Sequence, residues 1–415
     1  MNVANRTLFI ADNLDIMRGM NSEIIDLIYL DPPFNTKKQY KAPIGSPAEG
    51  AEFKDIWTDE DVKDGWYSEI AELYPNIHQI IQAAEHTYDH SMMIYLMAMG
   101  IRLIEMQRLL KTTGSIYLHC DPTASHYLKL IMDDIFGKNN FRNEIVWCYR
   151  GGGVPKSDFS KKHVILLRYS KTKDFPFNVD DIRIPYSQET QDRLRYRAKS
   201  FRGDRTYDNY DMNKKGKHPE DWWVMQPLMP SDKERTGYPT QKPLALLDRI
   251  IEASSNEGDL ILDPFCGCAT ACVSAEKLQR QWIGIDISPS AEVITKIRLE
   301  EASEEGFLFS PISMSDVTVT STPPTRTDET EPRQLHLPNY TIHKNDLYGK
   351  QAGNCTGCKR HFEIQNLTVD HIDPVSKGGT DHPKNLQLLC ANCNSTKGDR
   401  DQEYLIQRLK EQGIT

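Results

Sequence analysis

The chain has 415 residues, of which 39% are hydrophobic and 26% are charged, a composition typical of a globular protein with two or three domains. No apolar run approaches the roughly 20 residues of a membrane-spanning helix, and residues 1–10 lack the pattern of a secretory signal. The composition therefore argues against a membrane protein, and we expect a cytoplasmic location.

The net charge of −9 conceals an uneven distribution of charge along the chain. Residues 141–240 contain 20 Lys and Arg against 14 Asp and Glu, so this stretch is net +6. Residues 341–415 are nearly neutral, with 10 basic and 9 acidic residues. Because the acidity lies elsewhere, the total charge does not exclude a nucleic acid as a partner.

The first third of the chain has the pattern of an α/β fold. Short apolar runs at 7–10, 26–30 and 115–119 predict buried parallel strands. Longer periodic patterns at 92–111 and 128–136 predict helices. Strands and helices that alternate in this way favour a mostly parallel sheet.

The α/β pattern is interrupted and then returns. Residues 143–232 are polar, basic and aromatic with weak periodicity, and we expect loops and short elements there. After them come predicted helices and strands at 243–254, 260–262, 269–278, 282–285 and 291–302. Residues 310–340 are rich in Ser, Thr and Pro, which predicts a flexible linker. We therefore expect domains at 1–309, with an insert at about 143–235, and at 341–415.

The first candidate for chemistry is the segment Asp31, Pro32, Pro33 and Phe34, which directly follows a predicted strand. An exocyclic base nitrogen is a poor nucleophile because its lone pair is delocalised into the ring. The Asp31 carboxylate and the Pro32 carbonyl can each accept an amine hydrogen bond, which favours a tetrahedral nitrogen. Phe34 can stack on a flipped base. Taken alone, the segment could equally be a strand that ends in a proline-rich turn.

Two further motifs follow in the second α/β stretch. Residues 263–270 read Asp-Pro-Phe-Cys-Gly-Cys-Ala-Thr between a strand and a helix, and Asp286 ends the next strand, where an acidic residue suits a ribose diol. A dinucleotide site is the alternative, but its Gly-x-Gly-x-x-Gly fingerprint is absent. Residues 236–243 read Thr-Gly-Tyr-Pro-Thr-Gln-Lys-Pro and by themselves predict only the start of a helix.

The order of the three motifs resembles the β class of DNA amino-methyltransferases over roughly residues 5–305. The resemblance implies a Rossmann-like α/β fold that uses S-adenosylmethionine. It also implies contacts between this cofactor and two sets of residues: Asp263, Phe265, Gly267 and Asp286 in the turn and strand, and Thr240, Gln241 and Lys242 over the methionine end. Asp12 matches an acidic residue that the family often has near the cofactor adenine. Ala269 departs from the family, which usually has Gly there.

The target base and the reader of DNA are expected from the same resemblance. Asp rather than Ser opens the catalytic motif, which favours N6 of adenine over N4 of cytosine. A stretch that interleaves cations and aromatic residues is the candidate for gripping phosphates: Arg193, Arg195, Arg197, Lys199 and Arg202. A solvated helix face is the alternative for this stretch.

The C-terminal module has a second set of motifs. Cys355, Cys358, Cys390 and Cys393 form two Cys-x-x-Cys pairs, a spacing that predicts a structural Zn²⁺ site. Between and after them lie Asp370, His371, Asn385 and Asn394, and residues 350–402 resemble HNH nucleases with a ββα-metal core.

The resemblance to HNH nucleases assigns roles to these polar residues. It implies that His371 activates water and that Asp370 and Asn394 hold Mg²⁺ or a similar divalent ion. Asn385 would brace the loop. The alternative is a zinc module that only binds DNA.

Together these motifs predict a site-specific methyltransferase of double-stranded DNA, fused to an HNH endonuclease and related to restriction–modification or mobile elements. A dimer or a restriction-system partner is compatible with this, and no P-loop occurs in the chain. Other candidates are a pure modification enzyme and a methyltransferase of RNA or of protein glutamine amides. The basic insert and the nuclease motifs favour DNA.

Overall fold

The computed structural model describes residues 2–63, 65–151, 153, 155–195, 213–304, 306, 314–328, 343–381 and 385–414. The chain forms two compact units, residues 1–56 with 102–330 and residues 57–101 with 331–415, and each is described by itself. Among the helices described, none is both long and apolar enough to cross a lipid bilayer.

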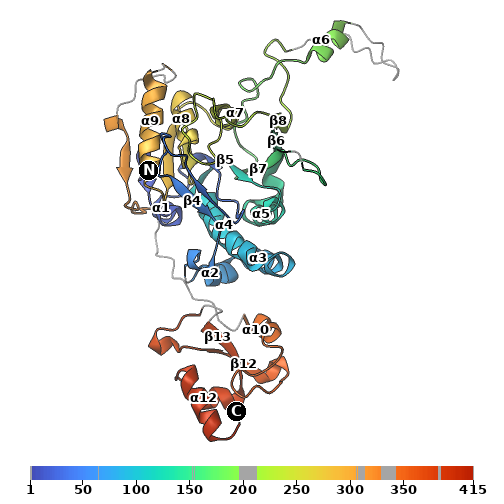
Figure 1. Ribbon diagram of the computed structural model, residues 1–415, viewed down its shortest axis with the longest axis vertical. Coiled ribbons are helices and arrows are strands. Elements are labelled where there is room, and N and C mark those ends of the chain that lie inside the picture. The colour runs from blue at the N-terminus through green and yellow to red at the C-terminus, as the bar shows by residue number, and fades with distance from the viewer. Residues whose placement is uncertain are drawn as a thin grey trace. The chain divides into compact units, whose positions relative to one another are not determined.

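The first unit is built on a nine-stranded sheet with the order β11-β1-β10-β9-β2-β5-β7-β6-β8 (Figure 1). The strands are β1 (Thr7–Ile10), β2 (Ile25–Leu30), β5 (Leu110–Cys120), β6 (Phe141–Cys148), β7 (His163–Ser170), β8 (Trp222–Val224), β9 (Leu260–Asp263), β10 (Gln281–Asp286) and β11 (Thr318–Thr320). From β11 to β5 every pairing is parallel, whereas β7 runs antiparallel to both β5 and β6. The mostly parallel sheet confirms the predicted fold class.

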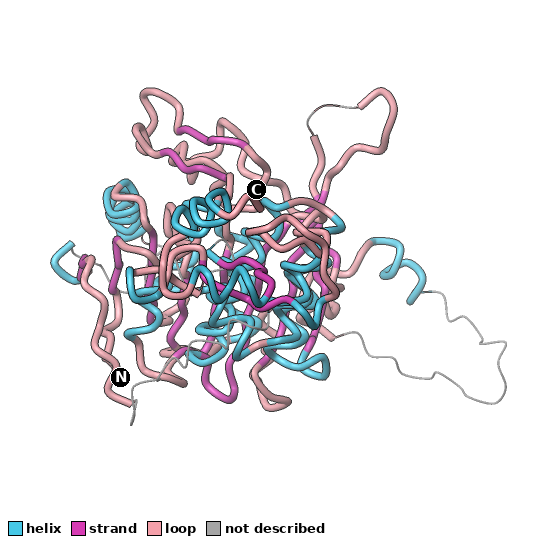
Figure 2. The backbone as a smooth tube through the Cα atoms, turned by 90° about the horizontal axis from the view of Figure 1, so that it is seen from below, coloured by secondary structure: helices cyan, strands magenta, loops and turns pink. Residues whose placement is uncertain are grey.

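Helices cover this sheet because its central strands are apolar throughout. Every residue of β9 is buried, as are five of the six residues of β2, which requires cover on both faces. The helices of this unit are α1 (Asn13–Gly19), the end of α4 (His90–Leu109), α5 (Ser125–Met132), α6 (Gln188–Arg195), α7 (Leu244–Ser254), α8 (Thr270–Lys277) and α9 (Ser290–Glu304). Figure 2 distinguishes the helices in cyan from the strands in magenta, and α7, α8 and α9 pack side by side (Figure 1). A hairpin of β3 (Lys38–Lys41) and β4 (Glu52–Asp55) lies outside the sheet.

The prediction of loops and short elements for residues 143–232 is wrong for β6 and β7. These eight-residue strands extend the sheet beyond β5, with Cys120 opposite Ile165 and Cys148 opposite His163. Most residues of β7 are buried, since its run Val-Ile-Leu-Leu faces the core. The polar average of the whole stretch concealed two apolar runs long enough for strands.

The prediction of a flexible linker over 310–340 is wrong for residues 318–328. Strand β11 pairs with β1, and Val317 and Val319 join the core of the first unit. The Ser22 N–H donates to the Asp328 carboxylate at 2.6 Å, which ties the following residues to the same unit. A short strand here covers what would otherwise be the exposed edge of β1. The predicted boundaries at 309 and 341 fall outside the described residues and stay predictions.

The second unit contains helices and a small ββα module. Its helices are α2 (Trp66–Leu73), α3 (Pro75–Thr87), the start of α4, α10 (Lys344–Lys350), α11 (Ala391–Lys397) and α12 (Gln402–Glu411). In the module, β12 (Leu367–His371) pairs antiparallel with β13 (Leu386–Cys390), and α11 follows directly. Leu388, Leu389, Leu405 and Leu409 are fully buried in a core separate from that of the sheet.

Candidate active sites

The carboxyl ends of the parallel strands meet at one edge of the sheet, the usual place for a ligand site in such folds. Asp31 follows β2, His119 lies near the end of β5, and Asp263 and Asp286 end β9 and β10. Asp12 comes two residues after β1, whose last residue pairs with Asp286. The fold therefore brings the first and second sequence motifs to one edge.

The loop after β2 holds a carboxylate oxygen to which none of the described residues donates a hydrogen bond. The two prolines fix their own φ angles and restrict the residues before them to extended backbone, so the Asp31–Pro33 segment is rigid. The Asp31 side chain is 17% exposed, yet its Oδ1 atom is shielded from solvent and accepts no hydrogen bond from the described residues. A buried acceptor without a partner is costly, and an incoming amine would satisfy it.

The other carboxylate oxygen of Asp31 is held by Lys242. The Lys242 ammonium forms a short ion pair with Asp31 Oδ2 and also donates to the Thr240 carbonyl at 3.1 Å. Burial raises the pKa of Asp31, and the Lys242 charge opposes that shift. The expected contact of Lys242 with the methionine end of the cofactor stays a prediction, and in the structure its ammonium pairs with the Asp31 carboxylate.

His119 is a site residue that sequence reasoning missed. Its Nδ1 lies 3.2 Å from the Tyr29 hydroxyl and 3.6 Å from Asp31 Oδ1. Its ring centroid lies 5.6 Å from both Phe34 and Trp147. Burial lowers the pKa of His119 well below its usual value, so the ring is neutral at pH 7. The signal was its place at the end of a predicted strand, which puts it on the catalytic edge.

The turn after β9 is organised by two carboxylates. Asp263 accepts the Phe265 N–H at 3.1 Å, and Asp286 accepts the N–H groups of Gly267 and Ser288, each at 2.8 Å. Burial raises the pKa of both carboxyl groups. Asp286 thus shapes the turn and keeps acceptor capacity for a further donor, since a carboxylate has about four acceptor positions.

The same turn requires unusual backbone at two positions. Gly267 has φ +51°, and a Cβ atom there would lie 2.9 Å from the Tyr238 ring. Ala269, where the family usually has Gly, has φ +56° and precedes α8. Left-handed backbone costs a non-glycine residue roughly 1 kcal/mol, so this chain stores strain beside the site.

Three other candidate residues from the sequence are placed as follows, and their expected contacts with the cofactor stay predictions. Gln241 accepts the backbone N–H and the hydroxyl of Thr236, both at 2.9 Å, and therefore braces its own turn. Thr240 is exposed with φ +62°, strained for a β-branched residue. Asp12 caps α1 and lies 3.3 Å from the Arg102 guanidinium.

The candidate DNA-binding stretch is only partly described. Arg193 and Arg195 lie in α6, but their side chains are not described. Arg197, Lys199 and Arg202 lie outside the described residues. The structure therefore leaves the expected DNA contacts as a prediction.

The four C-terminal cysteines form a candidate metal centre. Their sulfur atoms all lie within 4.8 Å of one another, and Cys358 and Cys390 are 3.9 Å apart. Sulfurs around a tetrahedral Zn²⁺ at about 2.3 Å would be about 3.8 Å apart. The Cys390 N–H also donates to Cys355 Sγ at 3.2 Å, as expected for thiolate ligands. The residues fit a four-coordinate zinc site.

The candidate nuclease residues lie on the ββα module. Asp370 and His371 end β12, and α11 contains Asn394. His371 Nε2 lies 2.5 Å from Asp381 Oδ1, a partner that sequence reasoning missed. The buried Lys397 ammonium lies 3.0 Å from Asp370 Oδ2 and donates to the His371 carbonyl at 2.6 Å. Lys397 thus contacts both Asp370 and the His371 backbone, while Asp381 contacts the His371 ring.

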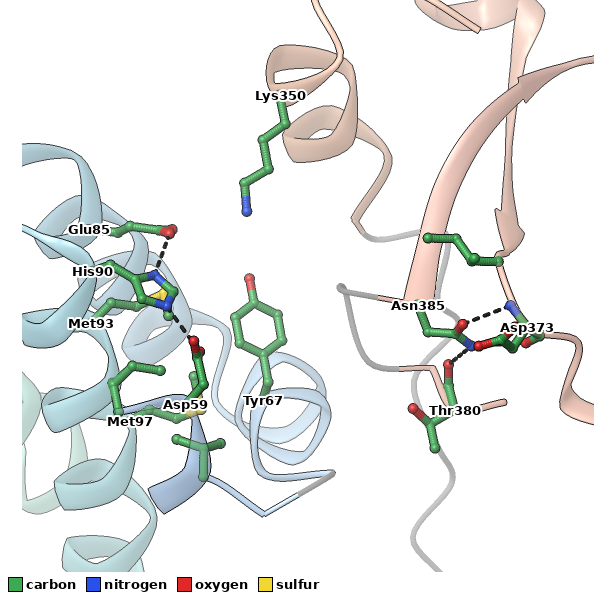
Figure 3. A pocket seen from close by; sticks show the side chains of 13 residues that line it. Asp59, Tyr67, Glu85, His90, Met93, Met97, Lys350, Asp373, Thr380 and Asn385 are labelled. Carbon is green, nitrogen blue, oxygen red and sulfur yellow. Dashed lines mark hydrogen bonds and ion pairs between the residues drawn. The ribbon is translucent and has the colours of Figure 1, made fainter. Parts of the chain in front are cut away.

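Asn385 braces the loop that follows His371, as predicted (Figure 3). Its side chain accepts the Asp373 N–H at 2.8 Å and donates to the Asp373 and Thr380 carbonyls at 3.0 and 2.8 Å. Gly379 is required beside it, because a Cβ there would lie 1.8 Å from the Asp373 carbonyl oxygen.

The curated relatives that match this chain include DNA methyltransferases. The type II methyltransferase M.HpaI of Haemophilus parainfluenzae is 28% identical over 71% of this chain and 74% of its own length. The DNA adenine methyltransferase YhdJ of Escherichia coli K12 is 28% identical over 72% of this chain and 84% of its own length.

Among solved structures, the PvuII DNA methyltransferase, described as cytosine-N4-specific, is 13% identical with a TM-score of 0.43. It covers 77% of this chain and 97% of its own. The modification methylase TTHA0409 of Thermus thermophilus, described as putative in function, is 16% identical with a TM-score of 0.42. It covers 77% of this chain and all of its own.

Two family models match the chain. The model for DNA methylases matches residues 25–296, more than half of the chain, and the model for HNH endonucleases matches residues 355–400. The first match includes the motifs at residues 31–34, 236–243 and 263–270, and the second contains the four cysteines and the Asp370–His371 pair. The chain belongs to the N6/N4 DNA methylase family and carries a C-terminal HNH domain.

Proposed function

We propose that this protein transfers a methyl group from S-adenosylmethionine to N6 of adenine in double-stranded DNA at a specific site, and that its HNH domain cuts DNA. The observation that supports methyl transfer is Asp31 Oδ1 on a proline-fixed loop: it is shielded from solvent and accepts no hydrogen bond from the part of the chain that the structure describes. A rigid acceptor at the sheet edge is what a base amine needs during methyl transfer.

The turn of residues 263–270 after β9, here called the donor turn because it is proposed to hold the methyl donor, fits S-adenosylmethionine. Asp286 keeps acceptor capacity for a ribose diol, and the following Ile287 is 74% exposed, which offers an apolar surface to an adenine ring. Gly267 leaves its backbone open to close approach. When bound, S-adenosylmethionine supplies a methyl group on a positively charged sulfur.

The residues of the catalytic loop act on the amine. Asp31 Oδ1 accepts one N–H and the Pro32 carbonyl a second, so the nitrogen lone pair turns out of the base plane. The N–C bond would form as the bond from the methyl group to the sulfur breaks, which leaves a neutral thioether. The nitrogen would then lose a proton, which the Asp31 carboxylate is placed to receive. Lys242 keeps this carboxylate charged before the reaction, and Phe34 stacks on the base.

Adenine is proposed as the base for two reasons. The catalytic motif opens with Asp, and the Escherichia coli relative is a DNA adenine methyltransferase. The test is mass spectrometry of nucleosides from DNA methylated in vivo and in vitro. We expect N6-methyladenine, and N4-methylcytosine without N6-methyladenine would overturn the choice of base. Parallel reactions with RNA and with protein substrates check that DNA is the acceptor.

The basic residues at 193–202 are proposed to grip the DNA backbone. The support is the net charge of +6 over residues 141–240, in a chain that is acidic as a whole. Replacing Arg195 and Arg197 by Ala should weaken DNA binding and reduce the slope of log affinity against log salt. An unchanged slope would contradict this assignment.

The HNH domain is proposed to be an active nuclease with a structural Zn²⁺ on its four cysteines. His371 would activate water, and Asp381 at 2.5 Å would orient the imidazole. Among the described residues, the contacts from Lys397 and Gln387 both use Asp370 Oδ2, so we propose that Oδ1 binds a Mg²⁺ or similar ion shared with Asn394.

The nuclease proposal is tested by metal-dependent nicking of plasmid DNA, methylated and unmethylated. Wild-type protein should nick in the presence of Mg²⁺ or Mn²⁺, and the His371→Ala variant should not. Absence of cutting on both substrates would favour a zinc module that only binds DNA. A nuclease and a methyltransferase in one chain suit restriction–modification or a mobile element, with a dimer or a system partner as a further proposal.

A further inference from the structure

We infer that Asp55 is a positioning residue for methyl transfer: its carboxylate holds the backbone that directly follows the catalytic motif, and so fixes the aim of Asp31 and Pro32. This inference rests on the proposed methyl transfer. Asp55 ends β4, a strand outside the central sheet, and neither the motifs nor their spacing point to it.

The carboxylate makes three hydrogen bonds to two consecutive residues. The Asn35 N–H donates to Asp55 Oδ1 at 2.7 Å, and the Thr36 N–H donates to Oδ2 at 3.2 Å. The Thr36 hydroxyl makes a short hydrogen bond to the same Oδ2. Asp55 is only 3% exposed, so water cannot readily replace these bonds. Charge-assisted bonds of this kind are roughly twice as strong as neutral ones.

The loop needs such a partner because its backbone is strained. Asn35 and Lys37, on either side of Thr36, both have φ +61°, in the left-handed region. Left-handed backbone is unfavourable for non-glycine residues and persists only where surrounding contacts enforce it. The Lys37 N–H donates to the Asp55 carbonyl at 2.9 Å, so one residue satisfies three successive amides. Without the carboxylate, we expect the turn to relax and the preceding prolines to shift.

Asp55 can act as a fixed anchor because the segment that bears it is tied down at its far end. The Ala48 N–H donates to the Thr236 carbonyl at 3.2 Å. Ala48 and Ala51 are 1% exposed and pack in one apolar cluster with Cys268 of the donor turn. Residues 37–56 therefore form a strap that joins the catalytic loop to the donor side of the site.

This placement predicts which kinetic constant changes. Asp55 acts through the loop, and the side-chain hydrogen bonds of Asp55 among the described residues go to Asn35 and Thr36 and not to the proposed donor-binding residues. Its loss should therefore slow the transfer step with little effect on donor affinity. A displacement of about 1 Å at a reacting group can slow a reaction by about 100-fold.

The test compares Asp55→Asn and Thr36→Val with a matched control, Glu52→Gln. Glu52 is an acid on the same strand with a half-exposed side chain, paired with Lys41 at 2.9 Å. We expect Asp55→Asn to lower the single-turnover methylation rate by about 10- to 100-fold and Thr36→Val by a smaller factor. The affinity for S-adenosylmethionine, by calorimetry, should stay within about twofold, and Glu52→Gln should match wild type in both. Asp55→Glu should recover part of the rate.

A rate that is unchanged, or that falls only in proportion to donor affinity and melting temperature, would overturn the inference. Hydrogen exchange of the amides of Asn35 and Thr36 gives a readout that does not depend on activity. The exchange rate of these two amides should rise in Asp55→Asn and not in Glu52→Gln. Equal exchange rates in the two variants would show that the Asp55 carboxylate does not hold this backbone. A wild-type protein that transfers no methyl group would instead refute the proposed function. Thr36→Val keeps the test open if Asp55→Asn does not fold.

Discussion

The ion pair between Asp31 and Lys242 affects the charge of the carboxylate that is proposed to be catalytic. Burial raises the pKa of Asp31, which disfavours the ionised form that is needed to accept a hydrogen bond from the base amine. The Lys242 ammonium counters this shift through an ion pair on Oδ2. The pair therefore favours the ionised form of Asp31, and among the described residues it leaves Oδ1 without a hydrogen-bond donor, as the proposed contact with a base amine requires.

Replacing Lys242 by Met should raise the pKa of Asp31 further. Methylation needs the deprotonated carboxylate, so activity is lost as the pH falls through this pKa. The acid limb of the single-turnover pH profile should therefore move to higher pH by about one unit or more. A limb that stays in place, or that moves to lower pH, would contradict the role given to Lys242.

A substitution of Asp263 tests how much the buried charge in the donor turn lowers the free energy of unfolding. Burial raises the pKa of Asp263 in the folded protein. The folded state is therefore favoured at low pH, where Asp263 is protonated, and it loses this stabilisation as the pH rises through the pKa of Asp263 in the folded protein. Asp263→Asn keeps an acceptor for the Phe265 N–H and removes the buried charge. Urea unfolding at pH 8 should show the variant more stable by about 1 kcal/mol, with a smaller gain at pH 5 and weaker donor binding. A variant less stable at pH 8 would refute this account.

At the scale of elements, the turn between β9 and α8 places the donor motif. Its backbone needs Gly267 in the left-handed region against the Tyr238 ring. Gly267→Ala should weaken the affinity for S-adenosylmethionine by about tenfold or more, because the added Cβ meets the ring and strains the turn. Calorimetry measures this loss.

Gly258 is the matched control for Gly267. It also has a positive φ, +83°, but a Cβ there meets no atom within 4 Å. Gly258→Ala should lower stability by about 1 kcal/mol and leave donor affinity unchanged. Equal loss of donor affinity in both variants would show that backbone strain alone, rather than closeness to the ligand, explains the effect.

The sequence predicts those elements whose pattern is local. Strands β1, β2, β9 and β10 and their helices are found because continuous apolar runs alternate with periodic ones. Strands β6 and β7 were missed because a polar average hid two apolar runs. Strand β11 was missed because three residues carry no periodicity and pair only once β1 offers an edge.

The residues of the candidate site also fall into those that the sequence predicts and those that it does not. Asp31, Asp263 and Asp286 are predicted because each stands next to a strand end in a recognisable motif. His119 and Asp55 contribute through contacts between segments far apart in the chain, which spacing does not reveal. Gln241 matched a motif, but its side chain bonds within its own turn.

At the scale of the whole molecule, the ββα module has a core of its own, separate from that of the sheet. Zinc binding to its cysteines should therefore contribute to the folding of this module alone. Cys358→Ser should lower zinc content, measured by mass spectrometry, and make the module sensitive to limited proteolysis. The methylation rate should stay within about twofold of wild type. Loss of methylation together with zinc would show that the two activities depend on each other.

The central claim is that the Asp31 carboxylate is the acceptor for the base amine during methyl transfer. Its most direct test is the single-turnover methylation rate of Asp31→Ala with donor affinity measured in parallel. The account predicts a loss of at least about 100-fold in rate, with affinity for S-adenosylmethionine within about threefold of wild type. A variant that methylates DNA within a few-fold of the wild-type rate would contradict it.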